Sequence, residues 1–134
     1  MVGSDDNRNK IRVLVVEDEP LIQALIVSEF LKGDCLTCST IDGSEAIALT
    51  REFLPDVIVL DLMLPGMSGE EILTALKKDS VLRSIPVIVF SNRSSNEDYR
   101  KLIDMGAEAY LVKADTDIHV LVSETKRIAT EKMQ

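Results

Sequence analysis

An aspartate directly after a run of apolar β-forming residues is the most informative feature of this sequence. Asp61 follows residues 57–60 (Val-Ile-Val-Leu), a run typical of a strand that is buried on both faces of a parallel sheet. Residues 62–69 read as a loop, so we expect Asp61 to be presented at the rim of a sheet rather than buried. In open α/β sheets, chemistry gathers at the carboxyl ends of the strands. Asp61 is therefore the first candidate functional residue.

Three further strand-like runs also end at polar side chains. The residues that follow these runs are Glu17 and Asp18, Ser91, and Lys113. Right-handed crossover connections bring the carboxyl ends of parallel strands to one face of a sheet. We therefore expect three carboxylates, a hydroxyl and an ammonium to meet in one shallow crevice.

Each of these residues has an ordinary interpretation by itself, as a helix cap, a turn residue or a solvated strand end. Together they indicate chemistry, because crowded carboxylates repel one another unless one is protonated or a cation lies among them. Three oxygen ligands without histidine or cysteine suit Mg²⁺, which usually completes its shell with waters and a phosphate. A lysine binds phosphate as a point charge, and an aspartate can accept a phosphoryl group. The set predicts a phosphoryl-handling site at Asp61.

Strand-like runs alternate with amphipathic helical stretches five times, which predicts an α/β fold with a parallel sheet covered by helices. The strand ranges are 11–16, 35–39, 57–60, 86–90 and 109–112. We expect the helices to begin near residues 18, 42, 68, 94–95 and 116. Residues 10–134 are expected to form one domain, and residues 1–9 a disordered leader.

Side chains suited to capping mark three of these helix starts. Asp18 can cap the first helix, and the pairs Asp42–Glu45 and Ser68–Glu71 have the spacing of a capping box. The first helix is expected to turn four apolar residues toward the sheet, namely Ile22, Leu25, Ile26 and Phe30.

Composition narrows the class of protein. The chain has 134 residues, of which 46% are hydrophobic and 28% charged, as in ordinary globular domains. Its net charge of −8 argues against direct nucleic-acid binding, which needs clustered Lys and Arg. The sequence contains neither the ~20-residue apolar run of a membrane span nor a signal-peptide core. We expect a cytoplasmic protein.

Two further groups of reactive residues have ordinary interpretations. Cys35 and Cys38 spell C-x-x-C, which can mark a redox pair or half of a zinc site. Residues three apart in a strand face opposite sides of the sheet, so we interpret them as two reduced cysteines that fill strand positions. The single histidine, His119, is expected to lie on the surface or to serve packing.

The ordered set of motifs resembles the receiver domain of two-component response regulators. The resemblance covers residues 10–130 and rests on four features, namely the acidic pair, the segment 57–69 around Asp61, Ser91, and the segment 106–113 that ends at Lys113. It implies a flavodoxin-like (βα)5 fold, in which a doubly wound five-stranded parallel sheet has the strand order 2-1-3-4-5.

The resemblance also implies roles for the acidic residues. Asp61 would accept a phosphoryl group from the phosphohistidine of a histidine kinase or phosphotransfer protein. Asp18 and Asp61 would ligate Mg²⁺ directly, Glu17 would do so through water, and the backbone carbonyl of Met63 would add a ligand. The protein would not be a turnover enzyme, although it would take part in its own phosphoryl transfer and autodephosphorylation.

The remaining implied residues form a switch. Lys113 would pair with the phosphoryl oxygens, the Ser91 hydroxyl would turn toward them, and Tyr110 would swing inward as Ser91 moves. This change would alter the face formed by the fourth helix, the fifth strand and the last helix, and thereby control an effector protein. A monomer, or a weak homodimer on phosphorylation, is expected.

One departure from the family pattern follows the lysine. Most receivers have a proline there, preceded by a cis peptide bond, whereas Ala114 follows Lys113 in this chain. Because a cis bond before a residue other than proline costs about 2.5–4 kcal/mol, we expect a trans bond and a different loop shape.

A second departure follows the switch serine. The family usually has a very small residue at this position, but Asn92 follows Ser91 here. Asn92, Met63 and Arg93 are expected to flank the opening to Asp61. These residues bear on the lifetime of the phosphorylated state.

Three alternative functions compete with a phosphorylated receiver. A degenerate receiver would bind partners without phosphorylation, but the intact acidic pair, Asp61 and Lys113 argue against it. A phosphohydrolase with an aspartate nucleophile generally carries a second acid two residues later, where this chain has Met63. A nucleotide-binding protein is disfavoured because no Gly-rich loop follows the first strand.

Overall fold

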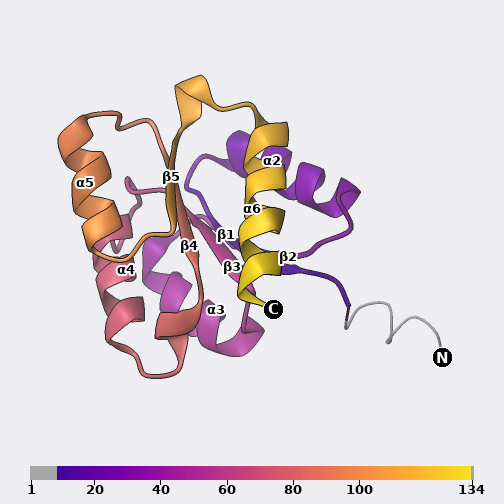
Figure 1. Cartoon of the computed structure of the whole chain (residues 1–134), viewed down its shortest axis with the longest axis horizontal. Coiled ribbons are helices and arrows are strands. Elements are labelled where there is room, and N and C mark those ends of the chain that lie inside the picture. Colours follow the sequence, from indigo (N-terminus) through magenta and orange to yellow (C-terminus); the bar gives the residue numbers. More distant parts are fainter. Residues whose placement is uncertain (1–8, 134) are drawn as a thin grey trace.

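A five-stranded parallel sheet forms the centre of the computed structural model, which describes residues 9–133 (Figure 1). The strands are β1 (Arg12–Val16), β2 (Leu36–Thr40), β3 (Val57–Leu60), β4 (Val87–Ser91) and β5 (Ala109–Val112). They lie in the order β2-β1-β3-β4-β5, and every neighbouring pair is parallel. The predicted flavodoxin-like class and strand order are confirmed.

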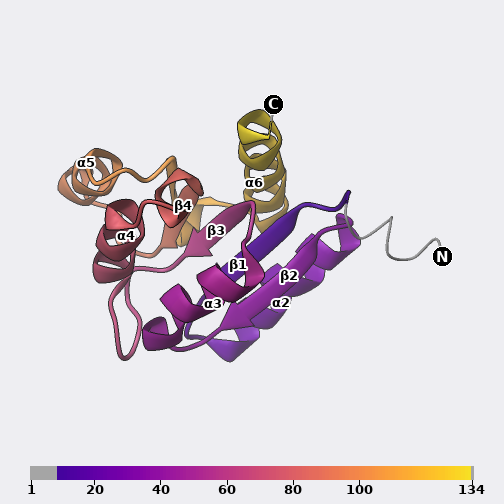
Figure 2. The same ribbon diagram turned by 90° about the horizontal axis from the view of Figure 1, so that it is seen from below.

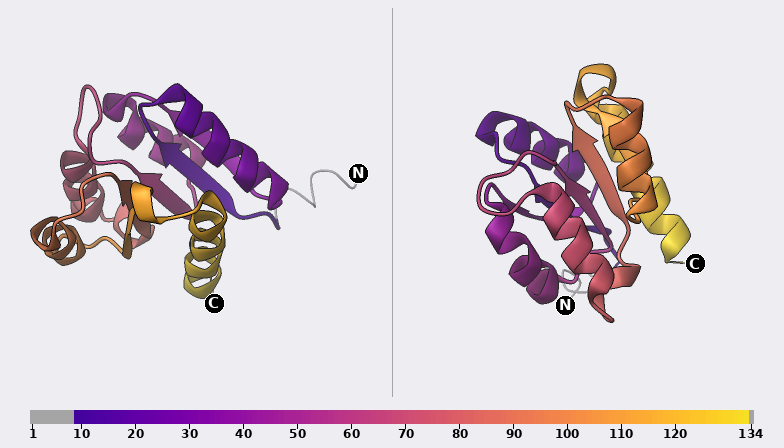
Figure 3. Two further views of the ribbon diagram at one scale, coloured as in Figure 1. Left: turned by 90° about the horizontal axis from the view of Figure 1, so that it is seen from above. Right: turned by 90° about the vertical axis from the view of Figure 1, so that its left-hand side faces the viewer.

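Five α-helices cover the two faces of this sheet. They are α2 (Pro20–Lys32), α3 (Ala46–Phe53), α4 (Gly69–Lys78), α5 (Asn96–Asp104) and α6 (Ile118–Lys132), and the short 3₁₀ turns are η1 (Gly43–Glu45), η2 (Leu82–Ser84) and η3 (Lys113–Asp115). Helices α2 and α6 pack on one face, and α3, α4 and α5 on the other. Figures 2 and 3 show this arrangement from three further directions.

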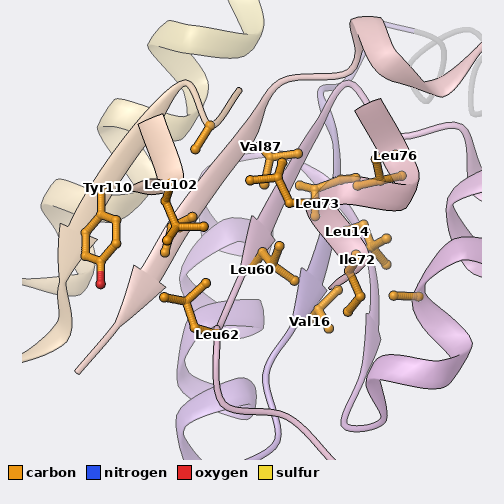
Figure 4. Packing of buried hydrophobic residues seen from close by; sticks show 14 of the residues in the cluster. Leu14, Val16, Leu60, Leu62, Ile72, Leu73, Leu76, Val87, Leu102 and Tyr110 are labelled. Carbon is orange, nitrogen blue, oxygen red and sulfur yellow. The ribbon is translucent and has the colours of Figure 1, made fainter. Parts of the chain in front are cut away.

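The core has one apolar layer on each side of the sheet because successive strand residues point to opposite faces. In β1, Leu14 and Val16 belong to the layer under α3, α4 and α5, whereas Val13 and Val15 belong to the layer under α2 and α6. Figure 4 shows the first layer, with Tyr110 beside Leu102 at its margin. Burial on both faces therefore accounts for the continuous apolar strands.

Several predicted boundaries move by one or two residues. Strands β2 and β4 each begin and end one residue later than expected, so Ser91 is the last residue of β4, where it is in register with Val112. The last helix begins at Ile118 rather than near Thr116, because residues 113–115 form η3 and Asp117 provides the N-cap.

Two of the three predicted caps are corrected. The residue that precedes α2 is Glu19 rather than Asp18, and no side chain caps this end. Asp42 caps η1 by accepting from the Ser44 backbone N–H at 2.9 Å, and it does not form a capping box. The predicted box at the start of α4, with Ser68 and Glu71, is confirmed.

Helix α2 buries a narrower stripe than expected. Ile26 and Phe30 are buried and Ile22 is half-buried, which follows their spacing of four residues along the helix. Leu25 was predicted to face the sheet, but it is exposed, like Leu21 one turn earlier. The prediction for Leu25 was wrong because apolar composition alone does not separate these two stripes.

The cysteines and the histidine lie as expected. Cys35 belongs to the layer under α2 and α6, while Cys38 packs against the opposite layer, and both are free thiols. The side chain of His119 is exposed. A redox or zinc role for the C-x-x-C pair therefore has no support from the fold.

The sequence predicted a disordered leader over residues 1–9 and no membrane-spanning segment. Apart from Asn9, the predicted leader 1–9 lies outside the described residues. Among the helices of residues 9–133, none combines the length and the apolar character that crossing a bilayer requires.

Backbone contacts hold the loop that follows β3. The N–H of Gly69 donates to the Leu62 carbonyl at 3.0 Å, and the N–H of Gly43 donates to the Pro65 carbonyl at 3.0 Å. A Cβ atom on Gly43 would lie only 1.8 Å from the Met67 carbonyl oxygen. Glycine is therefore required at position 43 for the loop to lie against η1.

We expect Gly43→Ala to destabilise the protein by about 1–3 kcal/mol, the usual cost of overpacking a close contact. Gly33→Ala is the matched control, because a Cβ at Gly33 would meet its nearest neighbours at 3.5 Å. Urea unfolding followed by circular dichroism measures both variants. Equal midpoints for Gly43→Ala and the wild type would contradict the loop packing described here.

Candidate functional site

A single ammonium group links the ends of three strands. Lys113, just after β5, places Nζ 2.6 Å from Oε1 of Glu17 after β1 and 3.0 Å from Oδ2 of Asp61 after β3. All three side chains are buried, with exposed fractions of 8% for Lys113, 2% for Glu17 and 6% for Asp61. The carboxyl edge of the sheet thus brings together three residues separated by up to 96 positions in sequence (17 to 113).

Asp61 is more deeply enclosed than expected. Its carboxylate Oδ1 accepts from the backbone N–H groups of Leu62 at 2.7 Å and Met63 at 3.4 Å, while Oδ2 accepts from Lys113. The prediction that Asp61 is presented rather than buried was wrong, because the loop folds back over the strand end. With these hydrogen bonds, each carboxylate oxygen of Asp61 has at least one donor.

Burial and ion pairing shift the pKa values of Glu17 and Lys113. Burial raises the pKa of Glu17, against the opposing effect of its hydrogen bond with Lys113. Burial alone would lower the pKa of Lys113, but its hydrogen bonds with Glu17 and Asp61 outweigh this effect and raise it. Lys113 is therefore held as a cation, as a buried ammonium between two carboxylates should be.

A group of carboxylates lies beside the ion pairs of Lys113 with Glu17 and Asp61. Oxygens of Glu17, Asp18 and Glu19 all lie within 4.8 Å of one another. The other oxygen of Glu17 accepts from the Glu19 backbone N–H at 3.1 Å, and the side-chain amide of Gln23 donates to the Glu17 carbonyl at 3.1 Å. Carboxylate oxygens in this number are the donors that a hard cation prefers, so the residues present fit Mg²⁺.

Ser91 and Tyr110 meet through the backbone of one residue. The N–H of Arg93 donates to Ser91 Oγ at 3.3 Å, and the Tyr110 hydroxyl donates to the Arg93 carbonyl at 2.7 Å. Both Ser91 and Tyr110 are buried. Burial is the first cause of the raised pKa of Tyr110, which therefore remains a neutral hydrogen-bond donor at physiological pH.

The three residues expected to flank the opening to Asp61 differ in their surroundings. Asn92 and Met63 are exposed, whereas the Arg93 guanidinium donates to Glu70 and Asp98. The peptide bond between Lys113 and Ala114 is trans, as expected, and residues 113–115 form η3.

Several contributors were not expected from the sequence. Glu19 joins the acidic group, Gln23 fixes the backbone of Glu17, and the Phe90 ring lies 5.9 Å from Lys113 Nζ. The run Glu17-Asp18-Glu19 was a signal for the first of these. No sequence pattern pointed to Gln23 or Phe90, because their contacts with Glu17 and Lys113 exist only in the folded chain.

The comparisons with known proteins agree with this geometry. Residues 13–124 match the family described as the response regulator receiver domain. The nitrate/nitrite response regulator protein NarP of Escherichia coli is 39% identical over 113 residues, which cover 83% of this chain and 51% of that protein. The DNA-binding response regulator MtrA of Mycolicibacterium smegmatis is 35% identical over 103 residues, covering 76% and 43%.

A solved structure extends the similarity to three dimensions. The receiver domain of a Francisella response regulator has a TM-score of 0.85 and 30% identity, and the alignment covers 91% of this chain and 98% of that one. The chain spans about half the length of the curated relatives it matches. Its relatives are signalling proteins of two-component systems. The chain belongs to the response regulator receiver domain family.

Proposed function

We propose that Asp61 is the phosphoryl acceptor of this receiver domain, which residues 10–134 form. The observation that carries the proposal is the buried Asp61 carboxylate, held at 3.0 Å by the Lys113 ammonium beside a group of acidic side chains. A buried aspartate that pairs with a lysine at the carboxyl edge of a parallel sheet stands where such folds place their reacting groups. The phosphoryl donor would be a phosphohistidine on a histidine kinase or phosphotransfer protein.

In the transfer, a carboxylate oxygen of Asp61 attacks phosphorus, the new O–P bond forms, and the P–N bond to histidine breaks. The electron pair of that bond returns to the imidazole nitrogen. Lys113 would balance the charge of the phosphoryl oxygens, and Ser91 would offer a hydroxyl donor. Hydrolysis of the acyl phosphate would restore Asp61, which is the autodephosphorylation expected of such a protein.

Asp18 and Asp61 would hold Mg²⁺ directly, with Glu17 through water and the Met63 carbonyl as a further ligand. When bound, the ion would neutralise negative charge on the transferring group. Support comes from the acidic group of Glu17, Asp18 and Glu19, of which Glu17 shares the Lys113 ammonium with Asp61.

The output would be a change on the face formed by α5, β5 and α6. Support comes from the backbone of Arg93, which contacts both Ser91 and Tyr110. A change at Ser91 would therefore reach Tyr110 and the helices around it. The partner would be an effector protein in the cytoplasm rather than nucleic acid, and the protein would be a monomer or a weak homodimer on phosphorylation.

The phosphohydrolase alternative is weaker. Its second acid would stand at Met63, whose thioether cannot donate or accept a proton in catalysis. The proposal is therefore signalling by a phosphorylated state rather than turnover of a substrate.

We expect the wild-type protein to gain the mass of one phosphoryl group when it is incubated with Mg²⁺ and acetyl phosphate. Asp61→Asn should gain none, because the amide is not a nucleophile of this kind. Asp104→Asn, which changes an exposed aspartate near the end of α5, is the control and should be modified normally. Intact-mass spectrometry makes the measurement, and modification of Asp61→Asn would overturn the assignment.

Removing the hydrogen-bond partner of a metal ligand typically lowers metal affinity by about tenfold or more, and removing the ligand itself should cost at least as much. We therefore expect Asp18→Ala to weaken Mg²⁺ binding by roughly tenfold or more. Asp34→Asn is the control, because Asp34 lies away from the site and pairs with Lys10. Isothermal titration gives the affinity. An unchanged affinity in Asp18→Ala would show that the proposed ligand set is wrong.

A further inference from the structure

Four charged side chains form a cluster over the loop between β4 and α5. Glu70 lies in the first turn of α4, Arg93 in the loop, and Asp98 and Lys101 in α5. Figures 2 and 3 show that α4 and α5 are neighbouring helices. We call these four residues the loop clamp.

Arg93 is the centre of the loop clamp. Its two terminal nitrogens reach the two oxygens of Glu70 at 3.2 and 3.3 Å, and one of them also contacts Asp98. Lys101 contacts Glu70 at 3.2 Å from the other helix. A bidentate pair with a planar guanidinium has a defined geometry, which a lysine at the same position could not reproduce.

The partners of Arg93 are themselves fixed. Asp98 Oδ2 accepts from the Ser95 hydroxyl at 2.8 Å, while the Asp98 N–H donates to the same hydroxyl at 3.0 Å at the start of α5. Glu70 directly follows Gly69, where the loop from Asp61 ends. The side chains of Arg93, Glu70 and Asp98 are only 31%, 22% and 23% exposed. These pairs are therefore shielded more than ordinary surface ion pairs, and they form a network.

The backbone of Arg93 connects the loop clamp to the site. Its N–H bonds to Ser91 and its carbonyl accepts from Tyr110, so fixing the Arg93 side chain also fixes both polar backbone groups. The hydrogen bonds with Asp98 and Glu70 raise the pKa of Arg93, and the contact with Arg93 lowers the pKa of Asp98. All three groups remain charged at neutral pH.

We propose that Arg93 is a positioning residue, and that the loop clamp holds the β4–α5 loop in the arrangement in which Ser91 and Tyr110 share the Arg93 backbone. Because the Arg93 N–H bonds to Ser91, whose hydroxyl would face the phosphoryl group, the loop clamp also lengthens the lifetime of that group on Asp61. The second part rests on the proposed function, whereas the positioning of the loop does not.

The test compares Arg93→Ala, Arg93→Lys and Asp98→Asn with the wild type. Arg127→Ala is the matched control, because Arg127 makes a similar pair of contacts with Glu124 and Glu131 on α6, away from this loop. The first readout uses unphosphorylated protein and measures amide hydrogen exchange of residues 92–95 and the NMR signals of the Tyr110 ring. The second follows loss of the phosphoryl group after the phosphodonor is removed.

We expect Arg93→Ala to speed exchange in the loop and to shift the Tyr110 signals. It should also speed loss of the phosphoryl group by roughly fivefold, which corresponds to the upper end of the interaction energies found for exposed ion pairs. Asp98→Asn should act in the same direction, and Arg93→Lys should restore only part of the effect because it loses the bidentate geometry. Arg127→Ala should match the wild type in both readouts.

Unchanged exchange and unchanged Tyr110 signals in Arg93→Ala would overturn the proposal, whatever happens at Asp61. Changed exchange without a change in phosphoryl lifetime would overturn its second part alone. If the wild type takes up no phosphoryl group, the first readout still decides whether Arg93 positions the loop. Failure of the loop clamp and failure of the proposed function are therefore separate results.

Discussion

The compensation of buried negative charge by one ammonium group is the constraint on which this structure depends. Two carboxylates with almost no exposed surface lie at neighbouring strand ends, and such groups are unfavourable without a partner. Lys113 supplies that partner and contacts both, so three strands must end at the same height. The apolar layers on both faces of the sheet hold the strands in that register. A phosphoryl group on Asp61, as proposed above, would add further negative charge next to this ammonium.

The route from this site to the molecular surface is short. Ser91 is the last residue of β4 and lies in register with Val112, beside Lys113. One residue later the chain enters the loop whose backbone receives the Tyr110 hydroxyl. The Tyr110 ring lies 6.0 Å from that of Tyr99, which is an exposed residue of α5. Under the proposed function, a change of charge at Asp61 would reach an outer helix through these neighbouring residues.

The strand ends could be predicted from the sequence, because a continuous apolar run followed by a polar residue is typical of a buried strand that reaches the rim of a sheet. The residues that meet there, including Glu17, Asp61 and Lys113, could be identified in the same way. The burial of Asp61 could not, since it results from the loop folding back through close contacts at Gly43 and Gly69. Pairings such as that of Arg93 with Glu70 join residues 23 positions apart in sequence, and only the packing of α4 beside α5 creates them.

The central claim is that Asp61 and Lys113 form a site for a phosphoryl group. A crystal structure of the protein with Mg²⁺ and beryllofluoride, a mimic of that group, tests this claim most directly. We expect beryllium bonded to an oxygen of Asp61, and Lys113 Nζ in contact with a fluorine atom rather than with Glu17. Beryllofluoride bound elsewhere, or Asp61 unmodified with Lys113 still bridging Glu17 and Asp61, would contradict the claim.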